Sequence, residues 1–158
     1  MRTVDVYLEQ LDHAWDHKWE SLTAALEGVT EEEAAFQSPC YAAEEPEEGW
    51  PAPGTVLWQI AHVAHCKRHY ADILRSLGAP ARPPVAPRSP CATLADERAA
   101  LAEAHAGQRA AIAALDDTQL DASAGGGMSV REFLAMCIRH DTWHASQVAV
   151  VRRLFRTR

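Results

Sequence analysis

The residues best suited to chemistry lie near the end of the chain, in the stretch Ser129–Leu154. Within it, His140 and His144 are four residues apart, and Gln147 follows three residues later. An α-helix turns by about 100° per residue, so side chains four apart lie about 40° from each other and roughly 6 Å along the axis. Two imidazoles in this arrangement can converge on one metal ion. The spacing therefore indicates a candidate metal site, and a hydrogen-bonded or surface histidine pair is the alternative.

The same stretch has the pattern of one amphipathic helix. Gly125–Gly127 interrupts the chain before it, and Ser129 with Glu132 forms a capping-box pattern. One face of this helix is predicted to carry Phe133, Cys137, His140, His144, Gln147 and Val151. An otherwise apolar face thus holds two histidines and an amide, and polar groups are costly to bury without a partner.

A third ligand is expected from the helix predicted over Thr55–Leu77. That helix carries three histidines within about two turns, namely His62, His65 and His69. His62 lies in its most apolar part, whereas His69 is next to Arg68 and is expected closer to solvent. We select His62 as the third ligand, and His65 and His69 are the alternatives one or two turns away.

A rival histidine pair, His13 and His17, lies in a first helix predicted over about Val4–Leu26. The apolar stripe of this helix comprises Val4, Leu8, Leu11, Trp15, Trp19, Leu22 and Leu26. Each histidine is two residues from Trp15, which is about 160° around the helix. The pair therefore falls near the back of the stripe, and we expect it to be a partly solvated surface pair.

Composition and charge exclude several classes of protein. The chain has 158 residues, 47% of them hydrophobic and 23% charged, which predicts a single globular domain over residues 1–158. The formal net charge is −7 and the basic residues do not gather beyond a short C-terminal tail, so we expect no nucleic-acid partner. No apolar run approaches the length of a membrane span, and Met1–Val6 lacks the apolar core of a signal peptide. We expect a cytoplasmic protein that does not enter a membrane.

The four cysteines indicate no disulfide framework or zinc ribbon. They are Cys40, Cys66, Cys91 and Cys137, scattered and without a Cys-x-x-Cys pair. In a reducing compartment they are expected to be thiols. Cys66 follows His62 by four residues and Cys137 precedes His140 by three, so each is a core residue or, alternatively, faces the site as a further ligand or a redox-sensitive thiol.

The remaining segments predict an all-α fold. A proline-rich loop is expected over Gln37–Gly54, and a third long helix over Thr93–Leu115. The connector Ala79–Pro90 is expected to be extended and to cross the length of the molecule. No strand pattern is present. The prediction is a four-helix bundle with one long crossover connection.

Two segments resemble a known family. One is Thr55-Val-Leu-Trp-Gln-Ile-Ala-His62-Val-Ala, which follows Gly49-Trp50; the other is the last helix, with Met128-Ser-Val-Arg-Glu-Phe-Leu and then His140-Asp-Thr-Trp-His144-Ala-Ser-Gln147. They resemble the DinB-like superfamily of four-helix proteins, which includes the YfiT-like thiol transferases and the mycothiol-dependent maleylpyruvate isomerases. The resemblance implies a divalent metal, often nickel or zinc, held by His62, His140 and His144. It also implies a homodimer.

Three functions are compatible with such a site. The resemblance implies a metal-dependent transferase that joins a low-molecular-weight thiol to a small electrophile. A metal-dependent hydrolase on the same site, and a non-enzymatic metal-binding or stress-related dimeric bundle, are the alternatives.

Further residues have expected supporting roles around that site. Gln147 is expected to orient a ligand or to form an ordinary buried hydrogen bond, and Asp141 and Asp12 are candidate partners for ring N–H groups. Trp50 is expected to fold over a pocket or onto the core. Core packing is expected for Trp58 and Trp143, and a place in the wall of a pocket is the alternative for both.

Overall fold

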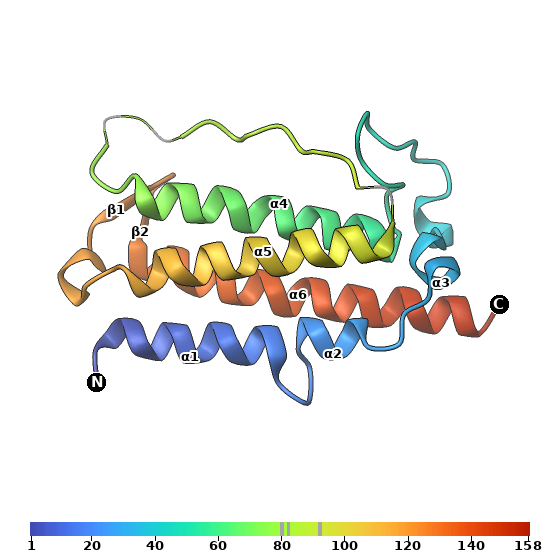
Figure 1. The fold of residues 1–158 in the computed structure, drawn as a ribbon, viewed down its shortest axis with the longest axis horizontal. Coiled ribbons are helices and arrows are strands. Elements are labelled where there is room, and N and C mark those ends of the chain that lie inside the picture. The colour runs from blue at the N-terminus through green and yellow to red at the C-terminus, as the bar shows by residue number, and fades with distance from the viewer. Residues whose placement is uncertain (80, 82, 92) are drawn as a thin grey trace.

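The computed structural model describes residues 1–79, 81, 83–91 and 93–158 (Figure 1). Its α-helices are α1 (Thr3–Asp16), α2 (Leu22–Leu26), α3 (Glu31–Ala35), α4 (Val56–Arg75), α5 (Leu94–Ala113) and α6 (Val130–Arg156). Single 3₁₀ turns cover Pro39–Tyr41 and Asp117–Gln119, and two short strands are β1 (Ser123–Gly125) and β2 (Met128–Ser129). The predicted all-α class is confirmed.

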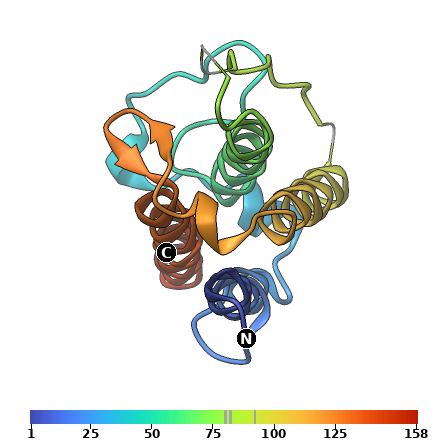
Figure 2. The ribbon, with the colours of Figure 1, turned by 90° about the vertical axis from the view of Figure 1, so that its left-hand side faces the viewer.

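Four helices form the bundle, and Figure 2 shows them end-on, with α4 between α5 and α6 and with α1 opposite α4. The helices α4 and α5 run in the same direction, so the segment between them must return along the whole bundle (Figure 1). This is the predicted crossover connection. In the predicted connector Ala79–Pro90, Pro80 and Arg82 lie outside the described residues, and residues 83–91 have no regular secondary structure.

The predicted single first helix over Val4–Leu26 is wrong, because the chain leaves the helix after Asp16 and begins α2 at Leu22. Ser21 caps the new helix by accepting a hydrogen bond from the Ala24 amide at 3.2 Å, and Glu20 before it has a positive φ of 62°. A serine side chain that bonds the backbone competes with a continuous helix. As a result Trp19, predicted in the buried stripe, is 66% exposed.

The predicted absence of strands is also wrong, since β1 and β2 pair antiparallel as a small hairpin before α6. Gly125, Gly126 and Gly127 at its turn all have positive φ, a conformation that glycine adopts without strain. The predicted capping box is confirmed: the Glu132 amide donates to Ser129 Oγ at 3.3 Å, and the Ser129 amide donates to Glu132 Oε2 at 2.8 Å. The hairpin and the box together fix where α6 begins.

The core consists of two apolar clusters separated by a polar layer. One cluster fills the end of the bundle near the hairpin, and the other fills the end where α4 begins. Between them the helices bury polar side chains, namely Lys67 of α4, His105 and Gln108 of α5, and Asp141 and His144 of α6. The buried polar and ionisable side chains are therefore concentrated near the midpoint of the bundle. Over the described residues, no helix is both long and apolar enough to cross a lipid bilayer.

Candidate metal centre

The histidines predicted as ligands come together where α4 and α6 lie side by side at this polar layer. The start of α4 is fixed by Thr55, whose hydroxyl accepts a hydrogen bond from the Trp58 amide at 2.9 Å. The ring centroids of His62 and His140 are 5.3 Å apart, and those of His62 and His144 are 4.9 Å apart. His140 and His144 have centroids 4.4 Å apart. One histidine of α4 and two of α6 thus share one small volume.

Among the described residues, His62, Cys66 and His140 form a group of potential ligand atoms. Their donor atoms all lie within 4.8 Å of one another. The Nε2 atoms of His62 and His140 are 3.3 Å apart, and Cys66 Sγ is 3.5 Å from His62 Nε2. The alternative in which Cys66 faces the site is therefore confirmed.

The distances from His62 Nε2 to His140 Nε2 and to Cys66 Sγ fit a tetrahedral ion. Two nitrogens about 2.1 Å from one zinc ion lie about 3.4 Å apart at the tetrahedral angle, and a sulfur about 2.3 Å away lies about 3.6 Å from each nitrogen. Soft thiolate and imidazole donors suit zinc and related transition metals better than magnesium or calcium. His140 Nδ1 is buried without a hydrogen-bond partner among the described residues. The donor set therefore fits a divalent transition metal.

His144 is held beside this group by Gln59 of α4. Its Nδ1 atom is hydrogen-bonded to Gln59 Oε1, and both side chains are buried. An amide oxygen accepts, so Nδ1 carries the proton and Nε2 keeps its lone pair. A fixed tautomer of this kind is what a metal-ligating histidine needs.

Burial keeps the three imidazoles in the neutral form that a metal requires. Desolvation, with the neighbouring imidazoles, lowers the pKa of His144 to about 3, and desolvation with His62 and Lys67 lowers that of His140 to about 4. The pKa of His62 is also lowered, by burial and then by His65. Burial raises the pKa of the Cys66 thiol to about 11. At neutral pH the centre therefore offers neutral nitrogens and a protonated thiol.

A cavity of about 500 Å³ reaches His62 and Gln59 from the loop between α3 and α4. Its walls include Trp50 and Trp58, whose ring centroids are 6.5 Å apart. Trp58 stacks on His62 with centroids 4.8 Å apart and planes 10° apart. Trp58 is half-buried and lines this cavity, so the alternative of a pocket wall holds for it rather than the expected core position. Trp50 also borders the cavity, which is one of the two expectations stated for it.

Lys67 and Asp141 form a buried ion pair next to the centre. Lys67 Nζ is 2.5 Å from Asp141 Oδ2 and 3.0 Å from Gln108 Oε1, and the lysine and aspartate side chains are 0% and 1% exposed. Asp141 therefore pairs with a lysine rather than with a histidine ring. Asp12, the other predicted carboxylate partner, pairs with Arg109 on the surface.

Several predicted residues lie outside the group. His13 and His17 are exposed, with ring centroids 5.4 Å apart, as expected of a surface pair. His65 and His69 are half-buried on α4 and are not in the ligand group found among the described residues. Gln147 is half-buried and Cys137 is buried in the apolar cluster near the hairpin. Trp143 is 65% exposed, so its predicted core position is wrong.

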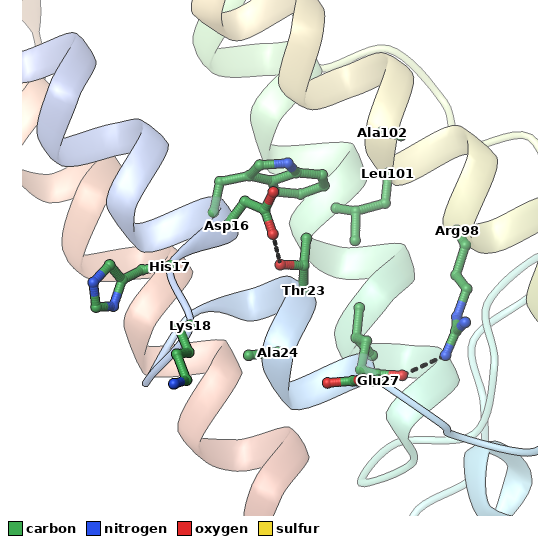
Figure 3. Close-up of a pocket in the computed structure, with 11 residues that line it drawn as sticks. Asp16, His17, Lys18, Thr23, Ala24, Glu27, Arg98, Leu101 and Ala102 are labelled. Atoms are coloured by element: carbon green, nitrogen blue, oxygen red, sulfur yellow. Dashed lines mark hydrogen bonds between the residues drawn. The ribbon is translucent and has the colours of Figure 1, made fainter.

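A second hollow of about 510 Å³ lies between α1, α2 and α5 (Figure 3), and no histidine of α4 or α6 is among its lining residues. Two of its charged groups bond within the protein, since Thr23 donates to Asp16 Oδ1 at 2.6 Å and Arg98 donates to the Leu26 carbonyl at 2.5 Å. The lining includes Trp15, which stacks on His105 with centroids 4.0 Å apart. This hollow brings together no metal-binding group among the described residues.

Two important residues were missed by the sequence analysis. Gln59 lies three residues before His62, close to it around the helix, which is the signal that could have identified it. Lys67 interrupts the apolar pattern of α4, and the sequence offers no sign that its charge is buried. Its partner Asp141 is 74 residues away.

A family model described as the DinB superfamily matches residues 14–148. The match extends from the end of α1 across α4 and α5 and into α6, and so contains His62, Cys66, His140 and His144. No curated protein matches the chain.

Proposed function

Because the chain belongs to the DinB superfamily, we propose that His62, His140 and His144 hold a divalent metal ion and that Cys66 lies within reach as a further donor. The centre then transfers a low-molecular-weight thiol to a small electrophile. The observation that carries the proposal is the 3.3 Å separation of the two Nε2 atoms of His62 and His140 at the end of a cavity.

Each residue has a separate task in this proposal. A bound divalent ion acts as a Lewis acid that lowers the pKa of a thiol, so that a thiolate is available near neutral pH. Gln59 fixes the tautomer of His144, and Trp58 fixes the plane of the His62 ring. The cavity beside Trp58 gives the electrophile a place within reach of the donors. The thiol proton is lost to solvent, the thiolate sulfur forms the new bond to carbon, and the leaving group departs with its electron pair.

The direct test is turnover with simple reagents. Protein loaded with nickel or zinc is mixed with cysteine and 1-chloro-2,4-dinitrobenzene, and formation of the thioether with release of chloride is followed by absorbance. We expect a rate that depends on both metal and thiol and that falls roughly a hundredfold or more in His140→Ala. His13→Ala is the matched control and keeps the rate.

Other outcomes separate the alternatives. Ester hydrolysis that needs metal but no thiol assigns the site to a hydrolase. No turnover with any metal and either class of substrate rejects an enzyme and leaves a non-enzymatic bundle.

The proposal also includes a single domain over residues 1–158 and a homodimer. A cytoplasmic location of the protein and a preference of its metal centre for nickel or zinc over other metals are part of the same proposal. Light scattering tests the dimer, and elemental analysis of protein purified without a tag tests the metal.

A further inference from the structure

The cavity that reaches the metal centre has an acidic mouth without a matching cation. Glu44, Glu45 and Glu47 line it, and no lysine or arginine does. Among the described residues, none of the three carboxylates forms an ion pair. An isolated carboxylate on the surface attracts a cation only weakly, because solvent screens its charge. Here they stand at the entrance of a hollow with aromatic walls.

The Trp50 wall of the cavity is held in place by neighbouring side chains. Arg88 packs over the Trp50 ring at 5.3 Å, and His65 meets its edge at 5.3 Å between centroids. The Arg88 guanidinium donates to the Gly49 carbonyl and pairs with the buried Glu97. Its charge is therefore engaged away from the three glutamates.

Tyr41 completes the wall next to Gly54. A Cβ at Gly54, whose φ is +73°, would lie 2.5 Å from the Tyr41 ring, so the close approach of ring and backbone requires glycine. Gln37 Nε2 donates to the Tyr41 and Glu44 carbonyls at 2.9 and 3.3 Å. These bonds hold the acidic part of the loop against the aromatic part.

The floor of the cavity contains a buried amide with an unused donor. Gln59 is 3% exposed and lines the cavity. Its oxygen is engaged by His144, whereas its Nε2 atom has no hydrogen-bond partner among the described residues. Because Gln59 lines the cavity and its Nε2 carries N–H donors, a hydrogen-bond acceptor on a ligand can meet it there.

We propose that this cavity selects an electrophilic substrate that carries a positively charged nitrogen, held at Glu44, Glu45, Glu47 and Trp50, and a hydrogen-bond acceptor that meets Gln59. The proposal rests on the function proposed above and names the substrate class. Carboxylates attract the cation, and a cation over an aromatic face gains a further contribution. The charged nitrogen of the substrate is then held at the mouth of the cavity, and its reacting end lies at the floor, near Gln59 and the metal centre.

The test compares two probes of the same shape, choline and its neutral isostere 3,3-dimethylbutan-1-ol. Their affinities for the full chain are measured by calorimetry, once with zinc bound and once after chelation. We expect choline to bind at least tenfold more tightly in both states, with the preference reduced by salt because the charges are exposed. Glu44→Gln/Glu45→Gln/Glu47→Gln is expected to reduce the preference to less than twofold, and Trp50→Leu to reduce it about threefold.

The matched control is Glu9→Gln/Glu48→Gln/Glu103→Gln. It removes the same total charge from exposed positions, one of them in the same loop, that do not line the cavity. We expect it to keep the preference. Equal affinity of the two probes in the wild type, or an equal loss of preference in both triple variants, overturns the inference.

The chelated sample separates this inference from the proposed function. Choline preference in protein that neither holds metal nor transfers thiols supports the cavity and rejects the function. Metal-dependent thiol transfer without a preference for choline supports the proposed function and rejects the inference about the cavity.

Discussion

Two of the histidine pairs with four-residue spacing lie in opposite environments, one exposed and one in the interior. His13 and His17 lie at the end of α1 and its exit, exposed to solvent, with centroids 5.4 Å apart. His140 and His144 lie in the middle of α6, with centroids 4.4 Å apart, and a third imidazole from α4 lies within 5.3 Å of both. A four-residue spacing therefore brings two imidazole rings together but does not by itself form a metal centre. A metal centre also requires a third ligand from a neighbouring helix.

The carboxylates beside the two pairs differ in the same way. Asp12 precedes His13 and pairs with Arg109, with side chains 40% and 47% exposed. Asp141 follows His140 and pairs with Lys67 in the interior, with both side chains almost fully buried. The pair of Asp12 and Arg109 is in contact with solvent, whereas the pair of Asp141 and Lys67 is enclosed in the polar layer. Four measurements test this contrast between the two histidine pairs and their carboxylates.

The largest difference is expected in metal affinity. Removing one of three or four protein ligands weakens binding by roughly a thousandfold, about 4 kcal/mol, because structural zinc sites gain on the order of 10–16 kcal/mol in total. We expect this loss in His140→Ala and none in His13→Ala, by competition with a colorimetric zinc chelator. Equal affinities in the two variants would remove the basis for distinguishing the pairs.

The next difference is expected in the ion pairs. Asp141→Ala leaves the Lys67 ammonium buried without its carboxylate, and such a loss costs about 3–4 kcal/mol, whereas Asp12→Ala on the surface costs about 1 kcal/mol or less. The free energy of unfolding in urea measures both. The double variant Lys67→Met/Asp141→Leu is expected to recover most of the loss, because no buried charge remains. Failure to recover would indicate that the pair is itself strongly stabilising.

The sequence predicted α4, α5 and α6 because helix formation follows from local periodicity. The meeting of His62 with His140 and His144 also depends on how two helices pack, which their apolar faces and the family resemblance indicated. His62, His140 and His144 each lie on an apolar face, and apolar faces must meet in a bundle. The box of Ser129 and Glu132 is likewise a pattern within four residues, and it is confirmed.

What the sequence did not predict depends on contacts distant in the chain or on a local competition. The burial of Lys67 requires Gln108 and Asp141, which are 41 and 74 residues away. The break after Asp16 required weighing the Ser21 cap against a regular apolar stripe, and the stripe continued through Trp19. Trp143 was assigned to the core from its residue type, although its side of α6 faces solvent.

A smaller effect is expected from acid. The folded state lowers the pKa of His140 to about 4, below the ordinary value of 6.5, so the unfolded chain takes up more protons as the pH falls. Stability without metal is therefore full above about pH 6.5 and declines toward pH 4, by on the order of 1 kcal/mol at pH 5.5 after allowance for partial exposure. Urea unfolding of chelated protein at pH 7.5 and 5.5 measures it. His140→Leu is expected to reduce this dependence, and Gln147→Leu on the same helix face to leave it intact; an unchanged dependence in His140→Leu would assign it to other groups.

The smallest effect is expected at the start of the two helices. The first amides of α6 are capped locally by Ser129, whereas the first amides of α1 at Thr3 and Val4 donate to Asp117 at 2.7 and 2.9 Å, across 114 and 113 residues. Ser129→Ala is expected to cost about 1 kcal/mol, a fall in Tm of roughly 3 °C, while metal affinity stays within a factor of about three. Asp117→Asn also lowers stability, but by weakening the attachment of α1 to the rest of the bundle, so hydrogen exchange increases in α1 and not in α6. If both substitutions loosen α6 equally, the two histidine helices are one cooperative unit, and the contrast between them is confined to their side chains.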